Sequence, residues 1–108
     1  MISKKEQRAL TRFKEILTQK FGSRITHLRL FGSKARGDDR PDSDIDVLVV
    51  TQEDDWKLKE EIGKVATFIL LEEGVYLSLK VFGEKSYDRL TRLASPFLKN
   101  IAREGKAF

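Results

Sequence analysis

Hydrophobic residues in the first part of the chain recur at spacings of three and four, the period of an amphipathic helix. The residues concerned are Leu10, Phe13, Leu17 and Phe21. Ser3 and Glu6 have the spacing of a capping box, in which each side chain satisfies a backbone N–H at the helix start. Gly22 is a typical helix stop. The pattern predicts a helix over residues 3–21 with one apolar face.

Three later segments have the pattern of strands. Residues 25–31 alternate between apolar and polar positions, as a half-buried strand does. Residues 44–50 end in Val-Leu-Val-Val, which is apolar on both faces and predicts a central strand covered on both sides. Residues 75–82 form the third predicted strand.

The remaining periodic segments predict helices. Residues 54–73 place apolar residues on one helical face and stop at Gly74. That face comprises Leu58, Ile62, Val65, Ala66 and Ile69. A weaker helix is expected over residues 84–93, and Ser95-Pro96 would begin a last one. The order of elements predicts an α+β fold, in which helices pack over a small mixed sheet.

Composition narrows the possible functions. The chain of 108 residues suits one domain over residues 1–108. Without cysteine it has no disulfide or thiolate metal site, and a single histidine argues against histidine-bound zinc. No apolar run approaches the roughly 20 residues of a membrane span, and the N-terminus does not resemble a signal peptide. We therefore expect no membrane association and a cytoplasmic location.

The net charge of +4 permits binding to phosphates, nucleic acid or an acidic protein. Acidic residues are interleaved with the basic ones, which is typical of a solvated surface. No interleaved basic and aromatic surface is evident, so nucleic acid is not the expected partner. His27 is expected to be a surface or edge residue rather than a base.

Two polar features lie between the first two predicted strands. Gly32-Ser33 follows the first strand, where glycine lets the backbone approach a ligand and N–H groups can bind an anion. Asp44 and Asp46 enter the second strand and share one of its faces, because strand side chains alternate. Two such carboxylates repel each other unless a cation such as Mg²⁺ lies between them. Each feature alone is common as ordinary structure.

Together the two features are more specific. Gly-Ser, ten residues, then Asp-x-Asp before an apolar strand resembles the DNA-polymerase-β-like nucleotidyltransferase superfamily. Gly-Ser-Lys-Ala-Arg-Gly with Ser-Asp-Ile-Asp resembles more narrowly the minimal nucleotidyltransferase family. The resemblance is close over residues 31–50 and loose over the rest of the chain.

The resemblance implies a nucleotidyltransferase fold, with ATP as substrate and one or two Mg²⁺ ions as cofactor. Gly32 and Ser33 would hold the β- and γ-phosphates, and Arg36 would reach phosphate oxygens. Asp44 and Asp46 would be the metal ligands and catalytic residues. A hydroxyl would attack the α-phosphorus and pyrophosphate would leave.

The family also has a third carboxylate on the strand after the next helix, where this chain has no acid. Ser78 is the residue expected at that position. Glu72, Glu73 and Glu84 flank the strand, but none is expected to substitute. This departure puts the rate of catalysis in question while leaving the nucleotide and magnesium site in place.

Minimal members of the family are often paired with a HEPN-domain toxin, which they counteract by binding or by adding AMP to it. The resemblance therefore implies a HEPN-domain protein as partner and antitoxin as role. One hypothesis is an active transferase that modifies a protein hydroxyl. Another is a catalytically weak or inactive nucleotide-binding antitoxin that acts through protein contacts. Transfer to RNA or to a small hydroxylated molecule is a third, and a homo-oligomer is left open.

Overall fold

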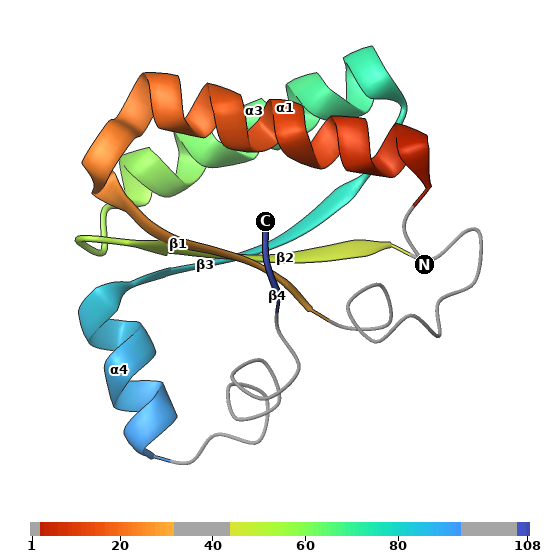
Figure 1. The fold of residues 1–108 in the computed structure, drawn as a ribbon. Coiled ribbons are helices and arrows are strands. Elements are labelled where there is room, and N and C mark those ends of the chain that lie inside the picture. The colour runs from red at the N-terminus through yellow and green to blue at the C-terminus, as the bar shows by residue number, and fades with distance from the viewer. Residues whose placement is uncertain (1–2, 32–43, 94–105) are drawn as a thin grey trace.

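A mixed four-stranded sheet with helices on both faces forms the centre of the computed structural model (Figure 1). The structure describes residues 3–31, 44–93 and 106–108. The strands are β1 (Ile25–Phe31), β2 (Ile45–Thr51), β3 (Leu77–Gly83) and β4 (Lys106–Ala107). Their order in the sheet is β3-β2-β1-β4. The α+β class with a mixed sheet, expected from the sequence, is confirmed.

Strand β2 lies between an antiparallel neighbour, β1, and a parallel one, β3. It is buried at six of its seven positions, because helices cover both of its faces. The prediction of a central strand is therefore confirmed. Strand β4 pairs antiparallel with the other edge of β1, over two residues only.

Helix α1 (Lys4–Phe21) begins with the predicted capping box. The backbone N–H of Glu6 donates to Ser3 Oγ at 3.1 Å, and the N–H of Ser3 donates to Glu6 Oε1 at 3.0 Å. The helix ends at Gly22, which begins the short 3₁₀ turn η1 (Gly22–Arg24) before β1.

Helix α3 (Trp56–Glu73) begins two residues later than the pattern predicted, because Asp55 caps it. Asp55 Oδ1 accepts hydrogen bonds from the N–H groups of Lys57 at 2.9 Å and Leu58 at 3.4 Å. The helix ends as predicted at Gly74, whose φ of 68° is in the left-handed region that favours glycine.

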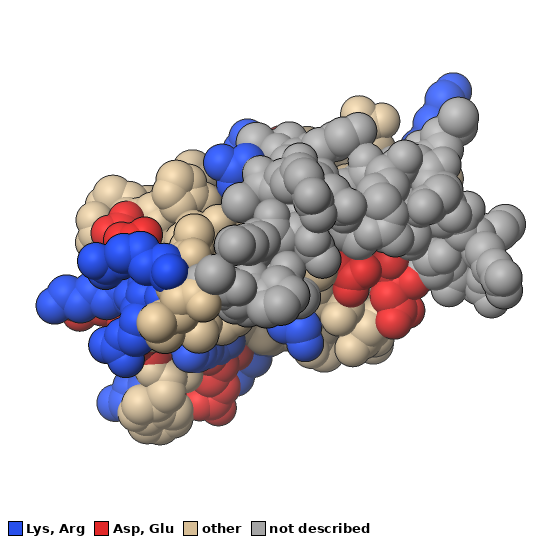
Figure 2. Space-filling view, turned by 90° about the horizontal axis from the view of Figure 1, so that it is seen from below, with Lys and Arg blue, Asp and Glu red and all other residues tan. Residues whose placement is uncertain are grey.

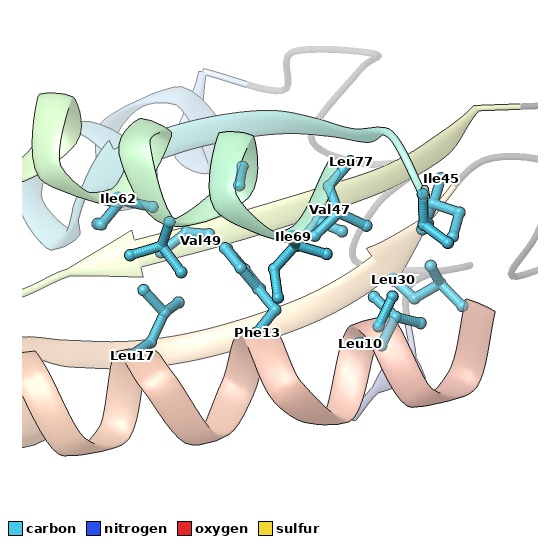
Figure 3. Close-up of a cluster of buried hydrophobic side chains, with 14 of the residues drawn as sticks. Leu10, Phe13, Leu17, Leu30, Ile45, Val47, Val49, Ile62, Ile69 and Leu77 are labelled. Atoms are coloured by element: carbon cyan, nitrogen blue, oxygen red, sulfur yellow. The ribbon is translucent and has the colours of Figure 1, made fainter. Parts of the chain in front are cut away.

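The main core lies between α1, α3 and one face of the sheet (Figure 3). Side chains of α1 point toward α3 and toward the odd-numbered positions of β2. All five residues of the predicted apolar face of α3 are buried. The labelled members are Leu10, Phe13, Leu17, Leu30, Ile45, Val47, Val49, Ile62, Ile69 and Leu77.

Helix α4 (Glu84–Arg92) lies on the opposite face of the sheet (Figure 1). A smaller cluster forms there from Phe31, Leu48 and Val50, with half-buried residues of β3 and α4 packed against it. The two faces of β2 therefore face different helices, and odd and even positions of the strand have different neighbours.

Two elements differ from the sequence-based expectation. Strand β3 begins at Leu77 instead of residue 75, because its partner β2 begins at Ile45 and the two residues are paired. Strand β4 was not predicted. The helix expected after Ser95-Pro96 lies outside the described residues. Among the residues described, no helix has both the length and the hydropathy of a membrane span.

Candidate functional site

Asp46 lies on the α4 face of β2. Positions 45, 47 and 49 of this strand belong to the α1–α3 core, whereas Leu48 and Val50 belong to the α4 cluster. Strand alternation therefore places Asp46 on the side of Leu48 and Val50. It is half-buried and makes contacts of its own, whereas Asp44 directly precedes the strand and is exposed.

The register of the sheet gives Asp46 two lateral neighbours. It pairs with Phe31 of β1 on one side and with Ser78 of β3 on the other. Paired residues in neighbouring strands present their side chains on the same face. Ser78 therefore lies beside Asp46. The resemblance to the superfamily implies a carboxylate at the position that Ser78 occupies.

None of the three flanking glutamates takes the place of that carboxylate. Glu84 follows Gly83, which pairs with Thr51 at the opposite end of β2. Glu72 and Glu73 end α3, in the helical layer on the other side of the sheet. Glu73 Oε1 is engaged there by Arg12 Nη1 at 2.8 Å. The expectation that these residues do not substitute agrees with their positions.

Two basic residues form the next row on the same face. Leu48, which follows Asp46 by two residues in β2, pairs with Arg29 of β1 on one side and with Lys80 of β3 on the other. Arg29 is half-buried and Lys80 is exposed. The sequence placed Lys80 on the face of Ser78, but Arg29 was missed because only the β1–β2 register brings it to this face.

The chemistry of the two aspartates suits a magnesium ion. Mg²⁺ prefers hard oxygen ligands and takes one or two carboxylates, filling its other positions with water and phosphate oxygens. In the described part of the chain, no group of three or more His, Cys, Asp or Glu side chains is arranged to hold a metal. Of the described carboxylates, those of Asp44 and Asp46 would hold the ion, and oxygens of the substrate would complete its coordination. Gly32, Ser33 and Arg36 lie outside the described residues.

Helix α4, which borders this face, is anchored by Asp54. Asp54 Oδ2 accepts from Ser86 Oγ at 2.6 Å, and Oδ1 accepts from the backbone N–H of Gly83 at 2.9 Å. The hydrogen bond from Ser86, then that from Gly83, holds the pKa of Asp54 below its ordinary value, with a smaller contribution from nearby Lys59. This carboxylate therefore joins the start of α3 to the start of α4.

The surface on the α4 side carries both signs of charge. Lys and Arg side chains gather at the end of the molecule where α4 lies, and Asp and Glu side chains lie among them (Figure 2). For the described residues, this mixture agrees with the interleaved charges of the sequence.

Similar sequences identify the family. The chain matches the family model described as a nucleotidyltransferase domain over residues 10–105. A protein of Methanocaldococcus jannaschii that carries the provisional name protein adenylyltransferase is 33% identical over 101 residues. The alignment covers 94% of this chain and 95% of that protein.

Solved structures support the same assignment. A provisionally named nucleotidyltransferase from Sulfolobus solfataricus superimposes with a TM-score of 0.50 at 25% identity, over 76% of this chain and 70% of its own. A structure described as a minimal nucleotidyltransferase superimposes with a TM-score of 0.62 at 24% identity, over 94% of each chain, and so shares the fold. The chain therefore belongs to the nucleotidyltransferase domain family and has the fold of its minimal members.

Proposed function

We propose that this protein transfers AMP from ATP, in the presence of Mg²⁺, to a hydroxyl group of a protein partner. The observation that carries the proposal is the position of Asp46. It lies near the start of a buried central strand, beside Ser78 and two residues after the exposed Asp44. Membership of the nucleotidyltransferase family supports a nucleoside triphosphate as substrate.

Each group has a defined role in this proposal. Asp44 and Asp46 share a face and hold the metal through their carboxylate oxygens, while Gly32, Ser33 and Arg36 bind the β- and γ-phosphates. Magnesium, when bound, supplies positive charge to the attacking and leaving oxygens. The acceptor oxygen forms a bond to the α-phosphorus, and the bond from that phosphorus to the bridging oxygen breaks. Pyrophosphate leaves, and the acceptor proton passes to solvent.

A protein acceptor is supported by the relative from Methanocaldococcus jannaschii, whose name specifies protein adenylylation. The resemblance to minimal nucleotidyltransferases implies a HEPN-domain protein as the partner. This chain would then be the antitoxin of that protein. A tyrosine hydroxyl of that partner is the proposed acceptor.

Ser78 favours a second candidate function. A positioned general base typically contributes 10²–10⁴-fold to a rate, and a serine beside Asp46 does not provide the carboxylate base of the superfamily. A chain that binds ATP and Mg²⁺ but transfers AMP very slowly would act on its partner by binding alone. The nucleotide site is the same in both candidates, so the rate of transfer separates them.

The two candidates are tested by incubating the chain and its HEPN-domain partner with Mg²⁺ and ATP that is labelled at the α- or the γ-phosphate. AMP transfer predicts label on the partner from α-labelled ATP and none from γ-labelled ATP. Asp44→Asn/Asp46→Asn should abolish the label, and Glu53→Gln/Glu60→Gln, which removes two exposed acids elsewhere, should retain it. Complex formation without label would favour the binding-only function, and label from γ-labelled ATP would contradict both.

A further inference from the structure

Beyond Asp46, the described strands present basic side chains on the α4 face of the sheet and no acidic one. Arg29 of β1 and Lys80 of β3 pair with Leu48 from opposite sides, so both lie on the face of Asp46. Their row is roughly 6.5 Å from the row of Asp46, because two residues of a strand span that length. The members of the row after that are His27, Val50 and Phe82.

Neither Arg29 nor Lys80 has an ionic partner among the described residues. The basic residues that form ion pairs in the described structure are Arg12, Arg24, Lys59 and Lys64. Arg29 is nevertheless half-buried, and Leu48 between the two cations is fully buried and apolar. The two cations therefore favour an anionic group that reaches their row.

One anionic group can meet both cations. The strands that carry Arg29 and Lys80 lie two strand spacings apart, about 9.5 Å, and both side chains are long. Lys80 is exposed, so the row is open to a molecule outside the chain. The register of the sheet therefore builds a small cationic subsite directly beside Asp46 and Ser78.

The place of this subsite relative to the proposed phosphate ligands indicates which substrate meets it. Gly32 and Ser33 follow Phe31 in the chain, and Phe31 pairs with Asp46 at the end of β1. Arg29 lies in the opposite direction along β1. In phosphoryl transfer the attacking and leaving oxygens are roughly in line on opposite sides of the phosphorus. Pyrophosphate that leaves toward Gly32 therefore requires the acceptor to approach from the side of the two cations.

We infer that Arg29 and Lys80 bind an acidic side chain next to the acceptor hydroxyl and so select the segment that is modified. This role rests on the AMP transfer to a protein hydroxyl proposed above, and it adds the chemical class of the acceptor, a hydroxyl residue flanked by Asp or Glu. Two cations suit one or two carboxylates, whereas nucleic-acid binding depends on neutralising a longer run of phosphates. Arg29 and Lys80 act through charge and position and take no part in the bond changes.

Peptide binding with a nucleotide that cannot transfer AMP tests the subsite separately from catalysis. The probes are heptapeptides with a central tyrosine that has two Glu, two Gln or two Lys residues on each side. They are titrated at low salt into the chain, with Mg²⁺ and α,β-methylene-ATP and also without nucleotide. The Glu-flanked peptide should bind about three- to ten-fold more tightly than the Gln-flanked peptide.

Variants of the two cations locate the effect. Arg29→Gln/Lys80→Gln should bind the Glu- and Gln-flanked peptides equally. Lys14→Gln/Lys20→Gln removes two exposed charges from α1, on the other face of the sheet, and should keep the preference. Lys80→Glu, at an exposed position, should favour the Lys-flanked peptide instead, which a merely unfolded variant could not do.

Replacing the analogue with ATP that is labelled at the α-phosphate separates this inference from the proposed function. Faster labelling of the Glu-flanked peptide, lost in Arg29→Gln/Lys80→Gln, would support both. A preference in binding without any label would support the subsite and contradict AMP transfer to these peptides.

Two results would overturn the inference. One is equal binding of the Glu- and Gln-flanked peptides to the wild-type chain, whether or not they are labelled. The other is binding of random-sequence single-stranded RNA that Arg29→Gln/Lys80→Gln weakens, without a preference among the peptides, which would make the row a nucleic-acid site.

Discussion

Ser78 is the residue at which this chain departs most clearly from the superfamily pattern. It pairs with Asp46 across β2 and β3, so a carboxylate introduced there would lie beside that aspartate. The resemblance to the superfamily, together with strand alternation, made Ser78 the expected residue at this position, and the parallel register places it beside Asp46. What alternation could not show is which residue of β2 lies opposite.

Ser78→Asp is expected to increase AMP transfer to the partner by about 10²-fold or more, because it adds a general base beside Asp46. It should also lower the melting temperature in EDTA, since a further carboxylate repels Asp46, and Mg²⁺ should reverse that decrease. Ser23→Asp, at an exposed position in η1, is the control and should change neither quantity. An unchanged transfer rate in a folded Ser78→Asp variant would show that the missing carboxylate does not limit catalysis.

Asp54 should make stability depend on acidic pH. Its pKa is lowered in the folded state, chiefly by the hydrogen bond from Ser86 and then by that from Gly83. The associated stabilisation is therefore present above the unfolded-state pKa, about 3.9. It is lost as the pH falls through the lower, folded-state pKa.

Asp54→Asn tests this dependence. At neutral pH it should cost about 0.5–1 kcal/mol of unfolding free energy, a small value because 43% of the Asp54 side chain is exposed. Thermal melting of both proteins from pH 7 to pH 2 should show the difference shrinking below the ordinary pKa of aspartate. A difference that stays constant down to pH 2 would contradict the assigned hydrogen bonds.

Among the secondary-structure elements, the sequence predicted best those that carry local signals. The capping box at Ser3 and the glycine stop after Glu73 define α1 and α3 within two residues. The late start of α3 has a long-range cause, because Asp54 bonds to Gly83 and Ser86 and leaves Asp55 as the cap. Strand β4 has only two residues, which are too few for a periodic pattern, and it is defined by its pairing with β1.

Gly83 joins β3 to α4 where the chain approaches Asp54 closely. A Cβ atom at this position would lie 2.7 Å from the backbone N of Asp54 and 2.7 Å from its Cγ. Gly83→Ala should therefore cost about 1–3 kcal/mol of unfolding free energy, measured by urea denaturation. Gly63→Ala in α3 is the control and should stabilise by about 0.5–1 kcal/mol, because nothing lies within 4 Å of the added methyl. Equal effects of the two substitutions would contradict the close approach.

At the scale of the whole molecule, the sequence predicted the class of the fold and the burial of the strand that carries Asp46, but not all of the residues around that aspartate. The apolar second half of β2 indicated a strand covered on both faces, which explains how Asp46 comes to lie beside a packed layer. The sequence could not predict that Arg29 lies on the same face of the sheet as Asp46. Its position depends on the β1–β2 register, which shifts between Ile25 and His27 and has no signature in the sequence.

The central claim is that Asp44 and Asp46 form a site for Mg²⁺ and ATP, and isothermal titration calorimetry tests it most directly. ATP should bind the folded chain with Mg²⁺ and much more weakly in EDTA. Asp44→Asn/Asp46→Asn should lose the Mg²⁺-dependent binding, whereas Glu53→Gln/Glu60→Gln should keep it. Absence of ATP binding to the folded wild-type chain, or equal binding to the Asp44→Asn/Asp46→Asn variant, would contradict the claim.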